Sequence, residues 1–397
     1  MVYPTRYLIL KVIILTPFLA AILTACRFSE TRTKSVQPLS PQIGHDIITT
    51  AASPGSTATI TPSQIPTAIT LSSSTPPTSP TPTATPVPTL IQLTTGGCCT
   101  QSFWSPDSER VLFIDKPDLG SPTGLWGVGL RGGPPQFVTD HLGVFSPDMQ
   151  WRAFPQNGQT VVEYLPDNAR WKIYNGGRPV SFSPDGLSLV WTAGNLGLPF
   201  DTSQRLLWIS QIDGSHARMI MMVYGGGFAG WFPDGRLLVT GRLNLKEKEQ
   251  SFWSLDPQNG SLAEIVRATS PRGYKLSPDG KWLVYYVAFS SDSAENGLWL
   301  VNTETRELHR LDLFGAYRWR TGDRLLVIPL DATASSNRLW QVDVGSPESN
   351  DIQANPLTDP ALTPFKIAND DWQVSPDGRF LSFVSALDHN IWLLKLP

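Results

Sequence analysis

Short apolar runs recur along the chain from about residue 110 to its end, and each run follows a polar turn. The runs are Arg110–Ile114, Trp151–Phe154, Leu187–Trp191, Leu237–Thr240, Trp282–Tyr286, Leu325–Ile328 and Phe380–Val384. Runs of this length, rich in β-branched and aromatic residues and bounded by turn residues, predict β-strands. Their recurrence at intervals of roughly 37 to 55 residues predicts a radial repeat.

The turn before each run is Ser-Pro-Asp-Gly or a variant of it. The copies open at Trp104, Phe145, Phe182, Trp231, Leu276 and Val374, with an eroded copy at Trp319. Proline fixes φ at the second turn position and glycine accepts a positive φ at the fourth, which predicts a type I turn closed by a glycine bulge. Ser108 and Met149 replace the glycine in two copies, and we expect those turns to be locally adjusted. A metal array is another interpretation of the recurring aspartates, but turn chemistry explains them without a metal.

A second motif, an apolar or aromatic residue followed by Trp, lies about twenty residues after the turns. Its copies are Leu125-Trp126, Leu207-Trp208, Phe252-Trp253, Leu298-Trp299, Leu339-Trp340 and Ile391-Trp392. The second unit departs from the pattern, with Val161–Leu165 at this place and no Trp. An aromatic platform for a ligand is one interpretation. Packing between neighbouring units is favoured, because large rings dominate buried contacts of this kind.

The repeats divide residues 89–397 into seven units of about 44 residues, the size of a four-stranded propeller blade. Strand a precedes the turn, strand b follows it, strand c holds the Leu-Trp pair and strand d comes about ten residues later. Candidates for strand d are Gln136–Thr139, Lys172–Tyr174, Arg218–Val223, Leu262–Arg267, Leu308–Leu311 and Asn355–Thr358. The last unit ends after strand c, and Leu90–Thr94 has the composition of the missing strand. We therefore predict an all-β, seven-bladed β-propeller of four-stranded blades, closed by this N-terminal strand.

The repeat pattern resembles that of the TolB-type, WD-repeat-like β-propellers. Their blades carry Trp/Phe-Ser-Pro-Asp-Gly, then an apolar strand, then Leu-Trp or Ile-Tyr, and the resemblance covers about residues 89–397. It implies the propeller fold. For function it implies a range, since the family includes envelope scaffold proteins, lyase-like enzymes acting on sugars, and propellers appended to prolyl-peptidase-like hydrolases.

Residues 1–26 are predicted to be a lipoprotein signal peptide. Arg6 and Lys11 give a basic start, Val12–Leu23 is apolar, and the segment ends at Leu23-Thr24-Ala25-Cys26. This order resembles the bacterial lipobox, in which a peptidase cuts before the cysteine and its thiol carries a diacylglycerol. Acyl chains such as palmitate on Cys26 would make the membrane a partner of the mature protein. A plain secretory signal and an uncleaved anchor are the alternatives.

Residues 27–88 are predicted to be a disordered stalk. Thr, Ser, Pro and Ala dominate the segment, and no charged residue occurs between Asp46 and Asp107. Such a composition buries too little apolar surface to offset the entropy of ordering, and its prolines keep it extended. The Thr and Pro content also suits O-glycosylation, but a plain spacer is the simpler interpretation.

Composition and motifs exclude several classes of function. The chain has 397 residues and a net charge of −3, without a long basic run, which argues against a nucleic-acid partner. It contains neither Gly-x-Ser-x-Gly nor His-Glu-x-x-His, and its five histidines fall in the stalk and in different repeat units. We therefore predict no cofactor and no local metal site.

Residues between strand d and the next turn are candidates for the channel mouth, where the loops of a propeller converge. They are Cys98, Cys99, Asp140, His141, Tyr224, Arg272, Tyr274, Tyr317, Arg318, Asp370 and Asp371. Asp370-Asp371 could help to bind a cation, but a solvated loop is favoured. His141 beside Asp140 could be a base with its orienting carboxylate, yet neighbours on one strand point to opposite faces.

Cys98 and Cys99 are the only thiols left once Cys26 is acylated. Two buried thiols, a strained vicinal disulfide, and a redox or metal site all remain open, in that order of preference. We expect neither cysteine to form a bridge to another part of the chain.

These features predict a lipid-anchored, extracytoplasmic binding or scaffold protein on a bacterial membrane. Its propeller would present a face to a protein, peptide or glycan, and we expect a monomer. The alternative is an enzyme, a lyase or hydrolase acting on carbohydrate at the channel mouth. Arg272, Tyr274, Tyr317, Arg318 and His141 would supply its groups, but they form no recognised motif. A binding function is therefore favoured over catalysis.

Overall fold

The computed structural model describes residues 88–97, 100–116, 120–194, 199–345 and 352–397. The predicted signal peptide and all of the predicted stalk except Pro88 lie outside these residues. Within them the chain is all-β, with one short 3₁₀ helix, Phe200–Thr202, and no helix there is long and apolar enough to cross a membrane. The strands are β1 (Thr89–Gln92), β2 (Thr100–Trp104), β3 (Arg110–Asp115), β4 (Gly124–Gly129), β5 (Gln136–Thr139), β6 (Val144–Phe145), β7 (Trp151–Gln156), β8 (Gln159–Tyr164), β9 (Ala169–Ile173), β10 (Ser181–Phe182), β11 (Ser188–Gly194), β12 (Gln204–Gln211), β13 (Arg218–Trp231), β14 (Leu237–Arg242), β15 (Gln250–Leu255), β16 (Leu262–Ala268), β17 (Arg272–Leu276), β18 (Trp282–Val287), β19 (Gly297–Asn302), β20 (Leu308–Leu311), β21 (Gly315–Thr321), β22 (Arg324–Pro329), β23 (Trp340–Asp343), β24 (Gln353–Pro356), β25 (Ile367–Val374), β26 (Phe380–Ser385) and β27 (Ile391–Lys395).

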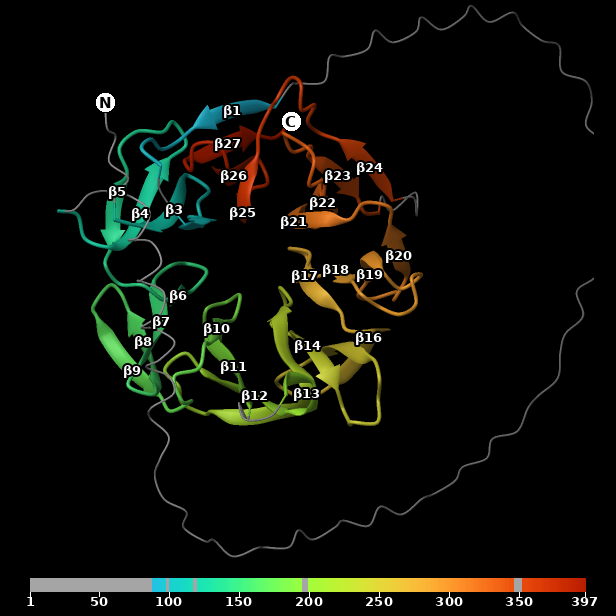
Figure 1. The fold of residues 1–397 in the computed structure, drawn as a ribbon. Coiled ribbons are helices and arrows are strands. Elements are labelled where there is room, and N and C mark those ends of the chain that lie inside the picture. Colours follow the sequence, from blue (N-terminus) through green and yellow to red (C-terminus); the bar gives the residue numbers. More distant parts are fainter. Residues whose placement is uncertain (1–87, 98–99, 117–119, 195–198, 346–351) are drawn as a thin grey trace, which may run out of the picture. The chain divides into compact units, whose positions relative to one another are not determined.

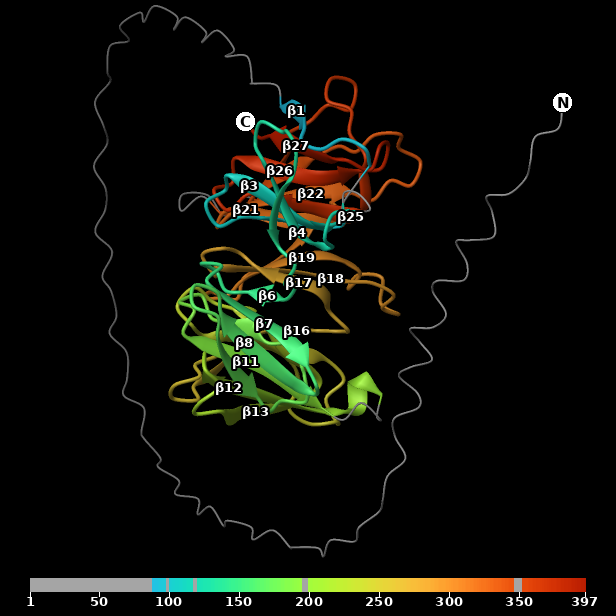
Figure 2. The same cartoon turned by 90° about the vertical axis from the view of Figure 1, so that its left-hand side faces the viewer.

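The strands pair into antiparallel sheets that follow the order of the chain. Five sheets have four strands, in the orders β2-β3-β4-β5, β6-β7-β8-β9, β17-β18-β19-β20, β21-β22-β23-β24 and β1-β27-β26-β25. The sixth has seven strands, β10 to β16 in sequence order. Figure 1 shows the sheets standing around a common centre, with β6, β10, β17, β21 and β25 on the inside. Figure 2 shows the same arrangement from the side.

The seven-stranded sheet forms because β13 is one continuous strand from Arg218 to Trp231, with no loop inside it. The sequence predicts strand d at Arg218–Val223 and a separate strand a before the next turn, but β13 is unbroken from Arg218 to Trp231. It pairs with β12 through its first half and with β14 through its second. Gly225, Gly226 and Gly227 make the change of partner possible. A Cβ on Gly226 would lie 1.9 Å from the Thr240 carbonyl oxygen, so only glycine fits there.

The first strand pairs with the last. Thr89 lies opposite Lys395 and Gln92 opposite Trp392, so β1 occupies the predicted place of strand d beside β27. Leu93 N–H continues the contact by donating to the Ile391 carbonyl at 2.9 Å, and Ile391 N–H donates to Thr94 Oγ1 at 2.8 Å. Segments at opposite ends of the described chain therefore form one sheet.

The recurring turns are held by their serine and aspartate. In the third copy Ser183 Oγ donates to Asp185 Oδ1 at 2.5 Å, and the same oxygen accepts the Leu187 N–H at 3.0 Å. These two hydrogen bonds hold the pKa of Asp185 below its usual value. Equivalent Ser–Asp bonds recur at Ser105, Ser146, Ser277 and Ser375, and Thr321 makes the bond in the eroded copy. The aspartates thus serve the turns, as the favoured interpretation of the motif holds.

The two turns without glycine are not adjusted, contrary to our expectation. Ser108 has φ +61° and Met149 has φ +56°, close to the +71° of Gly186. Their N–H groups close the same bonds, at 3.0 Å to the Ser105 carbonyl and 2.9 Å to the Ser146 carbonyl. The turn therefore imposes its geometry on residues that ordinarily avoid a left-handed backbone, and these residues bear the strain.

This strain predicts opposite effects of two substitutions. Met149→Gly should raise the free energy of unfolding by up to ~1 kcal/mol, because glycine adopts the left-handed backbone without strain. Gly186→Ala should lower it by ~1 kcal/mol; a Cβ there would meet no atom within 4 Å, so backbone strain alone acts. Urea unfolding of both variants measures the two changes. A loss of stability in Met149→Gly would contradict the assignment of strain.

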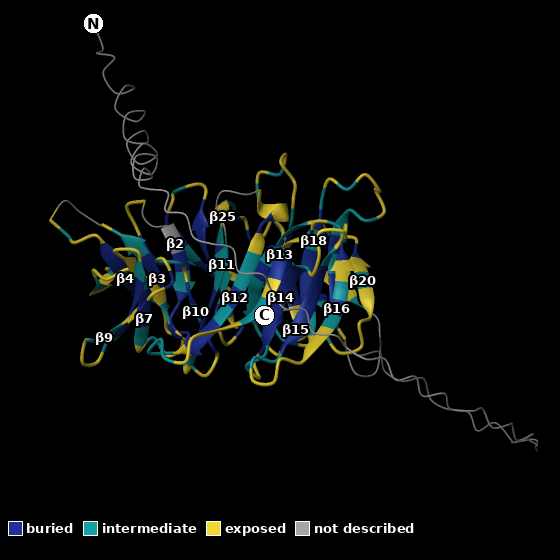
Figure 3. Ribbon diagram, turned by 90° about the horizontal axis from the view of Figure 1, so that it is seen from below, coloured by how far each residue is buried: buried dark blue, intermediate teal, exposed yellow. Residues whose placement is uncertain are grey.

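Apolar clusters fill the junctions between neighbouring sheets. The predicted tryptophans take part: Trp253 is buried between strands β11–β12 and β14–β15, and Trp208 packs on a cluster formed by the two sheets that contain Val162 and Leu189. Figure 3 shows that buried residues concentrate in the strands, while both ends of the sheets carry exposed connections. The rings therefore belong to the core, as the favoured interpretation of the motif holds.

Sheet β6–β9 is the exception, because a buried ion cluster replaces an apolar pair. Arg152 lies opposite Glu163, and Arg152 Nε donates to Glu163 Oε2 at 2.6 Å. Arg170 Nε donates to Glu163 Oε1 at 2.7 Å. The Glu163 side chain is 0% exposed and that of Arg152 is 4% exposed. At the same register elsewhere two apolar residues face each other: Val111 and Val128, Leu237 and Leu255, Leu283 and Val301, Leu325 and Val342, and Leu381 and Leu394. The remaining pair is Leu189 with Ser210.

The two arginines keep Glu163 ionised. Burial is the largest single influence and acts to raise the pKa of the Glu163 carboxyl, but the hydrogen bonds and charges of Arg152 and Arg170 outweigh it and lower the pKa. Because folding lowers this pKa, the cluster stabilises the fold above the ordinary carboxyl pKa. That contribution is lost as the pH falls through the lowered, folded-state pKa.

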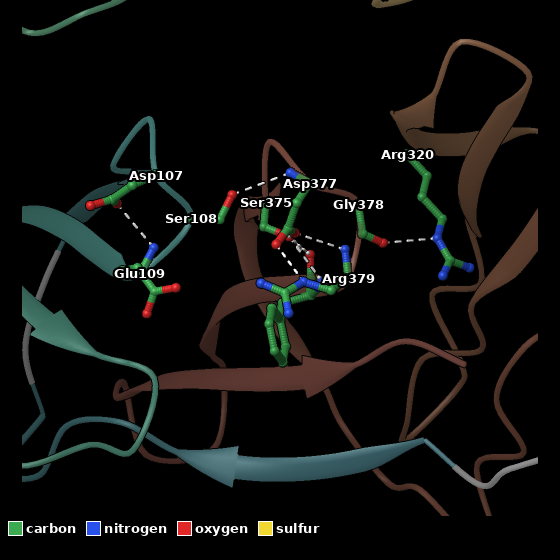
Figure 4. A network of polar contacts seen from close by, with 9 residues as sticks. Asp107, Ser108, Glu109, Arg320, Ser375, Asp377, Gly378 and Arg379 are labelled. Carbon is green, nitrogen blue, oxygen red and sulfur yellow. Dashed lines mark hydrogen bonds and ion pairs between the residues drawn. The ribbon is translucent and has the colours of Figure 1, made fainter.

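The ends of the sheets differ, and we name them. The turn end carries the Ser-Pro-Asp turns, and the loop end carries the connections from strand b to c and from strand d to the next strand a. Turns of neighbouring sheets touch: Ser108 Oγ accepts the Asp377 N–H at 3.2 Å, and Arg320 Nε donates to the Gly378 carbonyl at 2.9 Å (Figure 4). Such contacts gather the turns at one end, which places the other connections together at the opposite end.

Candidate functional site

Arg318 is the centre of a polar cluster on the inner strands β17, β21 and β25. Its Nη2 donates to both the Asp370 carbonyl and Asp370 Oδ2 at 3.1 Å, and its Nε donates to the Trp372 carbonyl at 3.2 Å. Its Nη1 donates to the Tyr317 carbonyl at 2.8 Å. The guanidinium also lies over the Trp372 ring, 4.8 Å from its centroid. Most of the Arg318 donors therefore form hydrogen bonds that connect β21 to β25.

The two neighbouring aspartates have structural partners as well. Asp370 Oδ1 accepts the Trp372 indole N–H at 2.6 Å, and Asp371 Oδ1 accepts the Ser102 hydroxyl of β2 at 2.9 Å. Both residues lie within β25 rather than in a loop, so that part of the favoured expectation is wrong, although the Asp370 side chain is solvated, with 54% of it exposed. The reason is local: Asn369 and Asp370 adopt positive φ values of +52° and +58°, which form a bulge in the strand rather than ending it.

The tyrosines of this region are committed to packing. Tyr317 is buried, and its hydroxyl donates to the Gly273 carbonyl at 2.6 Å. Tyr274 packs edge-on against Phe252, with ring centroids 5.3 Å apart. Burial raises the pKa of both phenols above their ordinary value. They are therefore poor proton donors or acceptors for a ligand in the channel.

Lys275 was not among the sequence candidates, yet it belongs to this cluster. It lies on β17 and keeps access to solvent. Desolvation by the surrounding chain lowers its pKa, the Arg318 charge adds to this effect, and the Asp370 charge opposes it. Its place in the sequence, two residues before the turn that begins at Ser277, would have assigned it to the end of an inner strand. Arg272, at the start of the same strand, is exposed as well.

The remaining candidates lie in other sheets. Tyr224 of β13 accepts a hydrogen bond from Gln204 Nε2 at 3.1 Å. Asp140 Oδ1 and His141 Nε2 are 3.3 Å apart and exposed, because the chain leaves β5 before Asp140 and the rule for strand neighbours does not apply. Cys98 and Cys99 lie outside the described residues. Among the residues that the structure describes, no three His, Cys, Asp or Glu side chains lie close enough together to hold a metal ion.

The loop end carries a feature that the sequence analysis missed. Ten large apolar side chains, 40 to 92% exposed, lie in its connections, whereas the described connections of the turn end expose only Leu187 in this way. The ten are Leu142, Tyr174, Phe200, Leu243, Leu245, Phe289, Phe314, Leu330, Leu362 and Leu387. We call this set the apolar loop ring. Single exposed apolar side chains are common, but ten in the connections of one end against one at the other make the loop end a candidate surface for a partner.

No protein-family model and no curated protein matches the sequence. Among solved structures, the chain is similar to an oligogalacturonate lyase in complex with manganese, with 15% identity and a TM-score of 0.52 over 78% of this chain and 97% of that one. It is also similar to oligogalacturonate lyase from Vibrio parahaemolyticus, with 13% identity and a TM-score of 0.50 over 79% and 98%. TolB from Acinetobacter baumannii shares 14% identity over 66% and 63%, with a TM-score of 0.38.

At these identities the two lyases show the fold alone. Together with the radial antiparallel sheets, they establish that the described strands form a β-propeller. Propellers carry many unrelated functions, so the function has to be argued from the surfaces of this chain.

Proposed function

We propose that the chain is a lipid-anchored, extracytoplasmic β-propeller of seven blades that binds a protein or peptide at the cell envelope through its loop end. The blade count treats β13 as strand d of one blade and strand a of the next. Shared in this way, the seven-stranded sheet supplies two four-stranded blades beside the other five. The pairing of β1 with β27 and the Ser102–Asp371 bond between β2 and β25 support closure of the ring.

The apolar loop ring is the observation that carries this proposal. Apolar side chains exposed on one end of a molecule favour burial against a partner, at about 25 cal/mol per Å² of apolar surface. The first described strand begins at the turn end, because Thr89 pairs with Lys395 at the end of β27.

Catalysis on carbohydrate, the alternative, has less support from the channel. Tyr274 and Tyr317 are held in the core, Arg318 is bonded to β25, and His141 lies in a different sheet from them. This alternative is kept because two of the similar structures are oligogalacturonate lyases. The cluster would have to rearrange before these groups could reach a substrate.

The anchor rests on the lipobox sequence that ends at Cys26. Cys26→Ser should abolish acylation and leave an unprocessed precursor, because the thiol is the group that carries the lipid. Metabolic labelling with a clickable fatty acid measures this. Labelling of the variant at the level of the unaltered protein would rule the lipobox out.

A comparison of two binding assays tests the function. The propeller without its stalk is used to capture partners from solubilised membranes and, separately, to probe a glycan array. We expect specific capture of a protein, reduced when Phe289, Leu330 and Leu387 are changed to serine and unchanged when Leu187 is. Binding confined to the glycan array, with no protein captured, would contradict a protein partner at the loop end.

A further inference from the structure

A pocket of about 470 Å³ lies at the turn end, between the halves of the seven-stranded sheet. On one side it is lined by the turn of Asp185 and by Ser188 and Gln211. On the other side it is lined by Trp231 and by Arg236 with its neighbours. Its size is within the range of small-molecule sites, about 300–1,000 Å³. It is separate from both the Arg318 cluster and the apolar loop ring.

Ser188 is the reason for this pocket. In each blade with an intact serine turn, the first residue of strand b donates its N–H to the turn serine, which fixes the register. The residues at this position are Arg110, Trp151, Ser188, Trp282 and Phe380.

The aromatic members of this set fill their junctions. Phe380 stacks on Trp104, with centroids 6.3 Å apart, and Trp282 packs on the same cluster as Trp319. Ser188 has no ring, so the face of the junction next to Trp231 stays open.

The lining groups suit a molecule with many hydroxyls. Asp185, Asp234 and Asp256 offer carboxylate acceptors, and Gln211, Gln258 and His216 line the same space. Arg236 donates its Nε to Asp234 Oδ2 at 2.7 Å and its Nη1 to Ser254 Oγ at 2.9 Å, and its Nη2 has no partner among the described residues. Three carboxylates face two arginines, Arg218 and Arg236, so the walls favour a neutral ligand over an anion.

We propose that this pocket binds a neutral sugar, up to the size of a disaccharide. The apolar face of a pyranose would lie against the Trp231 ring, and its hydroxyls would bond to the carboxylates, the glutamines and Arg236. The site is independent of the protein partner proposed for the loop end. A glycan ligand here would give the propeller two recognition surfaces at opposite ends.

Titration of the purified protein tests the site. The probes are cellobiose, lactose and N,N′-diacetylchitobiose, with digalacturonate as the anionic arm, followed by tryptophan fluorescence and calorimetry. We expect at least one neutral disaccharide to bind with a Kd of ~1 mM or tighter. Failure of all three with a cooperatively folded protein overturns the proposal, and so does tighter binding of digalacturonate.

A substitution that fills the pocket tests whether the sugar binds there rather than elsewhere on the surface. Ser188→Trp restores the ring that other blades carry and should weaken binding at least ~10-fold without lowering the melting temperature. Arg110→Trp places the same ring at the same register of another blade and should leave binding unchanged. If Ser188→Trp fails to fold, Gln211→Ala with Gln258→Ala serves in its place, with the same expected loss. Undiminished binding in the folded pocket variant overturns the proposal.

Discussion

Removal of Thr89–Thr94 is expected to produce the largest loss of stability in this protein. Leu93 is buried, Leu90 packs on the cluster of Phe383 and Leu394, and Ile91 packs on the cluster at the opposite face of that sheet. The buried Leu93 would lose about 1.5–3 kcal/mol of apolar burial and the half-buried Leu90 and Ile91 less, and each lost strand hydrogen bond would cost about 1 kcal/mol more. Their sum approaches the whole stability of an ordinary domain, about 5–15 kcal/mol.

Two shortened chains make the test. One begins at Val87 and keeps β1, and the other begins at Gly96 and lacks it. The first should melt cooperatively at the temperature of the mature protein. The second should melt far lower or aggregate, because removal of β1 exposes the edge of β27. Equal melting temperatures would mean that β1 does not hold the ring together.

Glu163→Gln is expected to destabilise the fold by about 3–5 kcal/mol. The change leaves Arg152 buried with no charged partner, and the penalty for an unpaired buried charge exceeds that for a lost surface ion pair. Thermal unfolding near neutral pH measures the effect. The loss relative to the unaltered protein should shrink as the pH falls through the lowered pKa of Glu163, where its carboxyl becomes protonated.

A double substitution is the matched control. Arg152→Leu with Glu163→Val installs the kind of apolar pair found at this register in sheet β21–β24, where Leu325 faces Val342. Replacement of a buried ion pair by packed apolar residues is often neutral or stabilising by about 1–4 kcal/mol. If the double variant is as unstable as Glu163→Gln, the ion cluster has a structural role that apolar packing cannot replace.

The sequence predicts the repeats well because their causes are local. A serine, a proline and an aspartate fix each turn, and the strands beside them follow within a few residues of the predicted bounds. Strand d of the penultimate blade is displaced, from the predicted Asn355–Thr358 to Gln353–Pro356. Leu90–Thr94 could be paired with the last blade because that blade alone lacked a strand.

Contacts between residues far apart in the sequence cannot be predicted from local sequence in the same way. Nothing local indicates that Glu163 contacts Arg152 and Arg170, or that Gly226 lets β13 pair with both β12 and β14. Ser188 and Phe380 occupy the same position in their strands, and only the structure shows that one leaves its junction open where the other fills it. The partners of the channel candidates could not be predicted for a related reason: proximity along the sequence does not show that Arg318 is bonded to β25.

Photo-crosslinking in living cells tests the central claim, that the loop end binds a protein partner. Benzoylphenylalanine is placed at Phe289 of the loop end, which is 92% exposed, and at Leu187 of the turn end, which is 65% exposed. We predict a discrete protein adduct from position 289 and none of that mass from position 187. Adducts of equal yield from both positions, or none from position 289 in a stably folded protein, would contradict it.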